Sequence, residues 1–174
     1  MKRLLTIYRQ PNLNLDTSHK MKRTAYRAII FNQDRLLVIQ SQKYGEIKFP
    51  GGGKEPNESA FDVLKREVLE ETGYRIKRTI VPFGSTLEYS EDHFTDYELF
   101  IQDSRYYLCD IYPEAVEPNY FDYEIDYGYY PKWVTLEEAI KTNETIIKND
   151  KIPWLERDTL VMKLLADLRD NHAD

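Results

Sequence analysis

The sequence predicts an α+β domain in which a mixed β-sheet lies between helices. Runs rich in β-branched and aromatic residues recur along the chain, as expected for strands. Two other segments carry apolar residues at helical spacing, one directly after a glycine-rich loop and one near the C-terminus. The length of 174 residues suffices for one well-buried core and is too short for two ordinary domains. Residues 1–174 are therefore expected to form a single domain.

The first third of the chain predicts strands that lead into the glycine-rich loop. Arg3–Tyr8 is expected to be a short strand. The runs TAYRAIIFN (24–32) and DRLLVIQSQ (34–42) predict two more, joined by a turn around Gln33. The segment Lys48–Pro50 then precedes three glycines, whose backbone can adopt conformations that are closed to other residues.

The segment after the glycines predicts a helix with two different faces. It is expected to begin near Asn57, a good N-cap residue, and to end before Gly73, where a left-handed glycine would cap it. The apolar face is formed by Ala60, Phe61, Leu64 and Val68. The acidic face carries Glu67, Glu70 and Glu71.

The acidic face predicts a bound cation. Spacings of i, i+3 and i+4 place the three carboxylates on one stripe, with neighbouring Cβ atoms about 5–6 Å apart. Like charges at this distance destabilise an isolated helix. A hard divalent cation that prefers oxygen ligands would neutralise them.

Beyond this helix the chain predicts further strands and two helices. The expected strands are Arg75–Pro82, Gly84–Tyr89, Tyr97–Ile101 and Arg105–Ile111. A loop rich in proline and tyrosine (113–131) follows, and then a strand at 132–134. Thr135 and Glu138 form a capping box for a short helix that reaches about Lys141. A C-terminal helix is expected over 153–170, with its apolar face at Leu160, Val161, Leu164, Leu165 and Leu168.

Composition and charge restrict the function and the location. A net charge of −6 argues against binding a nucleic acid polymer but not against a small nucleotide, because a metal ion can locally reverse the sign of an acidic pocket. The longest apolar runs are far shorter than a membrane span, and the apolar run LLTIY near the N-terminus is too short for a signal peptide. Cys109 is the only cysteine, so no intrachain disulfide can form, and a cytoplasmic location is expected. A buried position in a strand is expected for Cys109.

The segment GGKEPNESAFDVLKREVLEETGY carries a motif more specific than a charged helix face. An ExxEE pattern alone is more often a solvated surface. The full pattern from Gly52 to Tyr74 specifies nine positions. It resembles the Nudix box of the Nudix hydrolase superfamily (MutT-like), with Tyr74 where an aliphatic residue is usual. The preceding Phe-Pro-Gly-Gly and the later Trp-Val-Thr-x-Glu-Glu-Ala also resemble this family. The resemblance implies a Nudix fold from about Thr24 onward, with residues 1–22 as an N-terminal extension.

The resemblance also implies an activity: hydrolysis of the diphosphate linkage in a nucleoside diphosphate linked to a moiety X, with Mg²⁺ or Mn²⁺ as cofactor. Glu67, Glu70 and Glu71 would bind the metal, together with a backbone carbonyl of Gly51 or Gly52. Arg66 would orient the glutamates and Glu58 would support it from the start of the helix.

The roles of several other side chains are open at this point. Lys54 would contact a phosphate or remain a solvated lysine. In some family members the general base lies in a loop before the strand that corresponds to Trp133, and Glu124 and Asp126 are the candidates here. The tyrosines of 106–130 either stack on a nucleobase or pack within the fold.

The resemblance leaves the substrate and two other functions open. A nucleoside triphosphate, an oxidised nucleotide and a nucleotide sugar are all candidate substrates. The segment SQKYGEIK lacks the arginines of coenzyme A-specific members. Pro82 comes too early for the proline of ADP-ribose-specific members, and Tyr89 is only an approximate match to the tyrosine of diadenosine polyphosphate hydrolases. A non-catalytic nucleotide sensor is the main alternative, and a diphosphate isomerase would need a catalytic cysteine, for which Cys109 offers little support. Homodimers are frequent among relatives.

Overall fold

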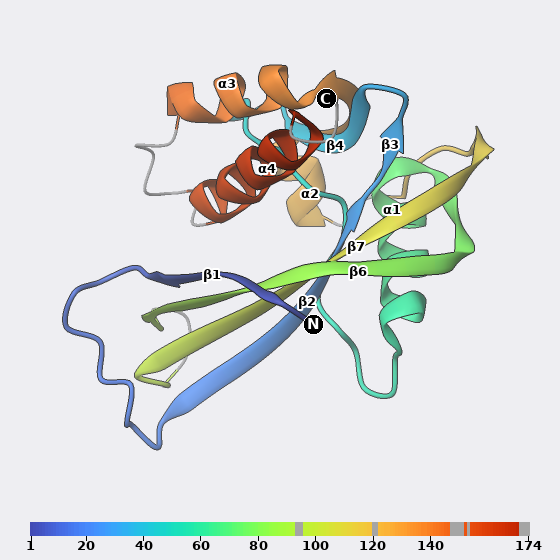
Figure 1. The fold of residues 1–174 in the computed structure, drawn as a ribbon. Helices are drawn as coiled ribbons and strands as arrows, with labels where there is room; N and C mark the ends of the chain where they lie inside the picture. The colour runs from blue at the N-terminus through green and yellow to red at the C-terminus, as the bar shows by residue number, and fades with distance from the viewer. Residues whose placement is uncertain (93–95, 120–121, 147–151, 153, 171–174) are drawn as a thin grey trace.

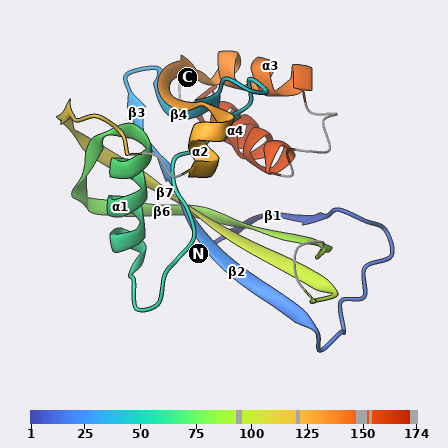
Figure 2. The same cartoon turned by 180° about the vertical axis from the view of Figure 1, so that it is seen from behind.

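The computed structural model describes residues 1–92, 96–119, 122–146, 152 and 154–170 and confirms the α+β class. Its strands and helices follow in the order β1 (Arg3–Tyr8), β2 (Lys20–Ile29), β3 (Phe31–Asn32), β4 (Arg35–Ser41), β5 (Ile47–Lys48), α1 (Ala60–Thr72), β6 (Tyr74–Glu91), β7 (Leu99–Ala115), α2 (Asp122–Tyr127), β8 (Tyr129–Thr135), α3 (Leu136–Ile146) and α4 (Leu155–Asp170). Helix α1 lies on one side of the strands, and α3 and α4 lie on the other (Figures 1 and 2).

The strands form two sheets. The larger sheet has the order β1-β6-β7-β2 and is mixed, because β1 is parallel to β6, β2 is parallel to β7, and the two central strands are antiparallel. In the smaller sheet β4 pairs with β3, β5 and β8, all antiparallel. Strands β6 and β7 extend well beyond the helices on the side of β1 (Figure 1).

Strand β4 separates two apolar cores. Leu36 and Val38 pack in a core that includes Val161 and Leu165 of α4. Leu37, between them, points the other way into a core with α1, because successive side chains of a strand alternate between its faces. The expected apolar face of α1 is confirmed at Leu64 and Val68, and it also includes Val63.

The predicted start of α1 is wrong by two residues. Asn57 has a φ of 66°, in the left-handed region, whereas an N-cap residue normally has an extended backbone. Ser59 is the N-cap, with φ −80° and ψ 170°, and it forms a capping box with Asp62. The predicted end is confirmed, because Gly73 caps the helix with φ 75°.

The four strands expected between residues 75 and 111 are in fact two long ones, β6 and β7. The β6–β7 pairing has a register shift between Pro82 and Gly84. Proline has no backbone N–H to donate, and a strand accommodates it at such an irregularity, so β6 continues beyond Pro82. The expected loop 113–131 is shorter than predicted, because β7 continues to Ala115 and β8 begins at Tyr129, with α2 between them.

The prediction places the start of α3 correctly and its end too early, whereas for α4 it places the end correctly and the start two residues too early. The Thr135 hydroxyl accepts from the Glu138 N–H at 3.1 Å, which confirms the capping box of α3. Helix α3 runs to Ile146, beyond the expected end. Helix α4 buries Val161 and Leu165, but Leu168 is exposed, contrary to expectation. Across the described residues, no helix is long and apolar enough to cross a membrane.

Candidate functional site

The glycine-rich loop is fixed against β2 and places α1 beside it. The Tyr26 N–H donates to the Gly52 carbonyl at 2.9 Å, and the Lys54 N–H donates to the Thr24 carbonyl at 3.0 Å. A Cβ atom on Gly52 would collide with the carboxylate of Glu67. The glycine therefore allows the Glu67 side chain to lie directly against the loop backbone.

Arg66 brings several predicted site residues together. Its Nε donates to Glu58 at 2.9 Å, and its Nη1 contacts Glu67 at 2.6 Å and Glu70 at 3.4 Å. Its Nη2 donates to the Gly53 carbonyl at 3.3 Å. One guanidinium thus joins the loop, the residue preceding the helix N-cap and two glutamates of the acidic stripe.

Glu71 is held apart from this group and points into the protein. Only 2% of the residue is exposed. Its Oε1 accepts from the Lys48 ammonium at 2.8 Å, and its Oε2 accepts from the Gly51 N–H at 2.7 Å. Lys48 was not among the predicted site residues. The available signal was its place directly before Phe49-Pro50, where a buried strand meets the glycine loop.

The pKa shifts in the acidic stripe show partly buried carboxylates whose charge Arg66 compensates only in part. Burial raises the pKa of Glu67, the Glu71 carboxylate raises it further, and Arg66 only partly opposes this. Burial also raises the pKa of Glu70 against the opposing influence of Arg66. The hydrogen bond from Arg66 lowers the pKa of Glu58. Added positive charge near Glu67 and Glu70 would favour their ionised forms.

The two candidate carbonyl ligands differ in their partners. The Gly51 carbonyl accepts from the guanidinium of Arg27, whereas the Gly52 carbonyl accepts only from a backbone N–H among the described donors. A carbonyl oxygen has two lone pairs, so the Gly52 oxygen keeps one for a further interaction.

The oxygen ligands at this site suit a divalent cation, but the three glutamates form ion pairs with an arginine and a lysine. Across the described residues, no group of three acidic, histidine or cysteine side chains is arranged to hold a metal ion. Glu67 and Glu70 face Arg66, and Glu71 faces Lys48. The carboxylates and carbonyl oxygens are nevertheless the hard ligands that Mg²⁺ and Mn²⁺ accept. A metal at this site would compete with these two side chains for the carboxylates.

Among the described contacts, neither Lys54 nor Asp126 joins this group. Lys54 is exposed next to the loop. Asp126 is exposed on α2, and among the described contacts no hydrogen bond or ion pair joins it to α1. Glu124 belongs to the same short helix, but its side chain lies outside the description.

Several of the tyrosines pack against one another. Tyr127 stacks on Tyr129 with ring centroids 5.2 Å apart. The centroid of the Tyr127 ring also lies 5.6 Å from that of Tyr44 and 6.2 Å from that of Trp154. Lys48 lies over the Tyr129 ring, 4.2 Å from its centroid. The aromatic cluster therefore adjoins the Lys48–Glu71 pair.

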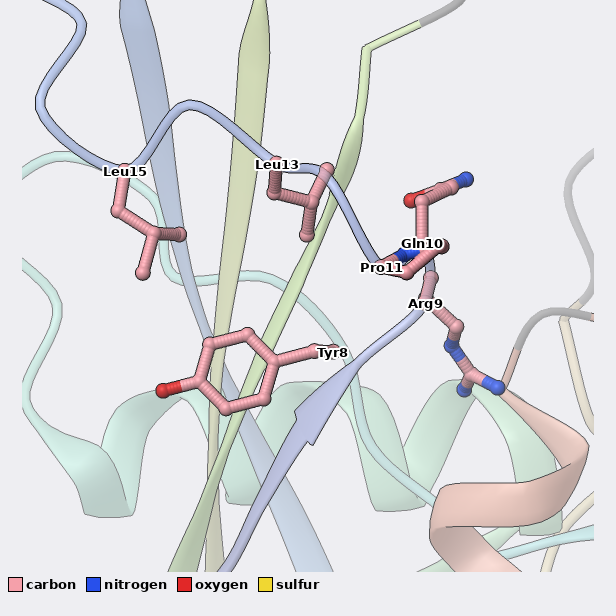
Figure 3. Close-up of a pocket in the computed structure, with 6 residues that line it drawn as sticks. All are labelled: Tyr8, Arg9, Gln10, Pro11, Leu13 and Leu15. Atoms are coloured by element: carbon pink, nitrogen blue, oxygen red, sulfur yellow. The ribbon is translucent and has the colours of Figure 1, made fainter.

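A hollow of about 540 Å³ lies away from these residues, beyond the end of β1. It is lined by Tyr8, Arg9, Gln10, Pro11, Leu13 and Leu15 (Figure 3). Arg9 points out of it toward α4 and pairs with Glu156 at 2.5 Å. None of the lining residues belongs to the acidic stripe or the glycine loop.

Comparisons with known proteins agree with the motif and the fold. A family model described as the NUDIX domain matches residues 21–157. A human protein, nucleoside diphosphate-linked moiety X motif 6, is 31% identical over 113 residues, which is 64% of this chain. The match covers only 33% of the human protein, so this chain corresponds to about a third of that relative.

Two solved structures resemble the fold. A NUDIX hydrolase from Nitrosomonas europaea aligns with a TM-score of 0.54 and 18% identity, covering 79% of this chain and 88% of that one. A structure described as an ADP compounds hydrolase aligns with a TM-score of 0.54 and 17% identity, covering 86% of this chain and 74% of that one. At these identities the similarity establishes the fold.

Proposed function

Because the chain belongs to the Nudix hydrolase superfamily, we propose that it is a metal-dependent pyrophosphohydrolase that cleaves a nucleoside diphosphate linked to a moiety X. The observation that carries the proposal is the charge imbalance around Arg66. One guanidinium faces Glu58, Glu67 and Glu70, and the pKa values of Glu67 and Glu70 remain raised. A divalent cation would supply the missing positive charge.

The residues of the site have two proposed roles, binding the metal and holding its ligands in place. Glu67, Glu70, Glu71 and the Gly52 carbonyl would hold Mg²⁺ or Mn²⁺, which when bound neutralises phosphate oxygens and activates a water molecule. Arg66 keeps two of these carboxylates in place and is itself held by Glu58. The Gly51 N–H fixes the other carboxylate.

Two steps need further groups. The proton of the attacking water passes to a carboxylate, and Glu67, Glu70, Glu124 and Asp126 are the candidates. Lys54, exposed beside the loop, is proposed as a contact for a phosphate of the substrate. In-line displacement at phosphorus then needs only positioning and charge stabilisation from the protein.

The proposed substrates are small nucleotides, namely nucleoside triphosphates, oxidised nucleotides and nucleotide sugars. The name of the human relative, nucleoside diphosphate-linked moiety X motif 6, supports this class. The single cysteine, Cys109, is consistent with our proposal of a reducing, cytoplasmic location. A homodimer is a further proposal from the family resemblance alone.

A substrate panel tests the proposal. The protein is incubated with Mg²⁺ and members of the three substrate classes and dinucleoside polyphosphates, and release of phosphate, pyrophosphate or nucleoside monophosphate is measured. Turnover of at least one compound that stops in EDTA is expected. Tight binding of one compound with no turnover of any would instead indicate the nucleotide sensor.

A further inference from the structure

Two buried carboxylates, one buried ammonium and one tyrosine lie beside the acidic helix. Glu46, Glu71 and Lys48 are 0%, 2% and 8% exposed. The Lys48 ammonium lies 2.8 Å from Glu71 Oε1 and 4.2 Å from the centroid of the Tyr129 ring. The Tyr129 hydroxyl donates to Glu46 Oε1 at 3.2 Å. A single tyrosine ring thus separates the ammonium from the second carboxylate.

Glu46 is the incompletely satisfied member of this group. Its Oε2 is buried and has no hydrogen-bond partner among the described residues. Burial raises the pKa of Tyr129, and the Glu46 carboxylate raises it further, so the phenol stays a neutral donor and brings no charge. A buried carboxylate without a cationic partner is costly.

The formal charges of these three side chains do not balance. Glu46 and Glu71 contribute two negative charges and Lys48 contributes one positive charge. If a divalent ion takes Glu71, Lys48 loses its partner there, and Glu46 offers a buried carboxylate with an open oxygen on the other side of the Tyr129 ring. Lys48 lies two residues after Glu46, at the spacing that places side chains on the same face of an extended chain.

We propose that Lys48 is an exchangeable counter-ion, which pairs with Glu71 in the absence of metal and moves across the Tyr129 ring to Glu46 when a divalent cation binds Glu71. The inference rests on the proposed function, because it takes Glu71 as a metal ligand. Glu46 is then a positioning residue that receives the displaced ammonium and so favours metal binding from outside the metal site.

Mn²⁺ binding to four proteins tests this exchange. The free Mn²⁺ signal in electron paramagnetic resonance gives the affinity of the wild type, Lys48→Met, Glu46→Gln and the double variant. Lys48→Met removes the competitor and is expected to tighten binding about tenfold, or 1.4 kcal/mol. Glu46→Gln removes the receiving carboxylate and is expected to weaken binding about fivefold, roughly 1 kcal/mol on the same scale.

The double variant separates exchange from a general charge effect. If Glu46 acts through Lys48, Glu46→Gln changes the affinity less than about twofold when Lys48 is already Met. An equal loss in both backgrounds would show a through-space charge effect and overturn the proposal. Unchanged or weaker binding by folded Lys48→Met would also overturn it.

A second measurement does not depend on the stability of Lys48→Met. Tyrosine ring resonances are recorded by NMR during titration with Mg²⁺, and the Tyr129 signal is assigned from its loss in Tyr129→Phe. The Tyr129 signal is expected to shift in the wild type and to shift much less in Glu46→Gln. The same shift in both proteins would contradict the exchange.

The outcomes also separate this inference from the proposed function. If neither the wild type nor any variant binds Mn²⁺, the metal site itself is wrong. If the wild type binds Mn²⁺, Glu71→Gln abolishes that binding and the Lys48 and Glu46 variants bind like the wild type, only the exchange is wrong.

Discussion

Gly52 and the carboxylate of Glu67 occupy adjoining space, so that any side chain at position 52 would displace the glutamate. The nearest atoms to a built Cβ belong to the end of the Glu67 side chain and not to the backbone. The φ angle of Gly52 does not lie in the left-handed region. The position therefore requires a glycine for the placement of Glu67.

Gly52→Ala is expected to damage the site more than the fold. Displacement of Glu67 should weaken Mn²⁺ binding about tenfold, or 1.4 kcal/mol, while the thermal unfolding midpoint falls little. Gly53→Ala is the matched control, because a Cβ there meets the end of the Arg23 side chain at 2.9 Å instead of a glutamate. Equal losses of Mn²⁺ affinity in the two variants would contradict the role assigned to Gly52.

Arg66→Lys is expected to lower the turnover number by about 10–100-fold, the range found when groups that orient metal ligands are changed. A lysine keeps the charge but cannot contact Glu58, Glu67, Glu70 and the Gly53 carbonyl at once as the guanidinium does. Steady-state kinetics with saturating Mg²⁺ measures the loss. Lys65→Arg, a change at the neighbouring helix residue, is expected to leave the rate unchanged. A turnover number equal to that of the wild type in Arg66→Lys would show that the guanidinium is not needed to orient the glutamates.

Gly73→Ala is expected to destabilise the protein more than Gly45→Ala. Both glycines have a positive φ, 75° and 80°. A Cβ at Gly73 would also overlap the Val116 carbonyl, whereas a Cβ at Gly45 meets no atom within 4 Å. We expect a loss of about 1 kcal/mol for Gly45→Ala and at least about 2 kcal/mol for Gly73→Ala, measured by urea unfolding. The reverse order would show that the contact with Val116 is easily relieved.

Cys109 is expected to be unreactive in the folded protein. It is 5% exposed, and burial together with the nearby Asp110 raises the pKa of its thiol to about 12. A raised pKa keeps the thiol protonated at pH 8, and only the thiolate reacts with a disulfide reagent. Reaction of the Cys109 thiol with a disulfide reagent at pH 8 is therefore expected to be as slow as unfolding in native buffer. In denaturant the same reaction is expected to be rapid. Fast labelling of the native protein would show that the thiol is accessible and ionised.

Local patterns predicted three of the four described helices, missed the short helix α2, and predicted the strands less well. The spacing of Leu64 and Val68 identified the buried face of α1, and Gly73 marked its end. The N-cap was misplaced because Asn57 and Ser59 are both good capping residues, and the reciprocal bonds with Asp62 decide between them. The lengths of β6 and β7 depend on pairing with each other across many residues, which no local pattern reports.

The candidate site was predictable where its residues lie close in sequence. Glu58, Arg66, Glu67 and Glu70 belong to one short segment and meet through one guanidinium. The partner of Glu71 was not predictable, because Lys48 lies 23 residues earlier, on another element. The Lys48 ammonium also lies over the ring of Tyr129, which the pairing of β8 with β4 brings from much later in the chain.

Turnover of a nucleoside diphosphate derivative by the wild type and Glu71→Gln, in Mg²⁺ and in EDTA, tests the central claim most directly. The account predicts that the wild type is active in Mg²⁺, inactive in EDTA and active again when Mg²⁺ is restored. It also predicts that folded Glu71→Gln loses at least about 100-fold in rate, roughly 2.7 kcal/mol of transition-state stabilisation. Turnover that persists in EDTA, or full activity of Glu71→Gln, would contradict it.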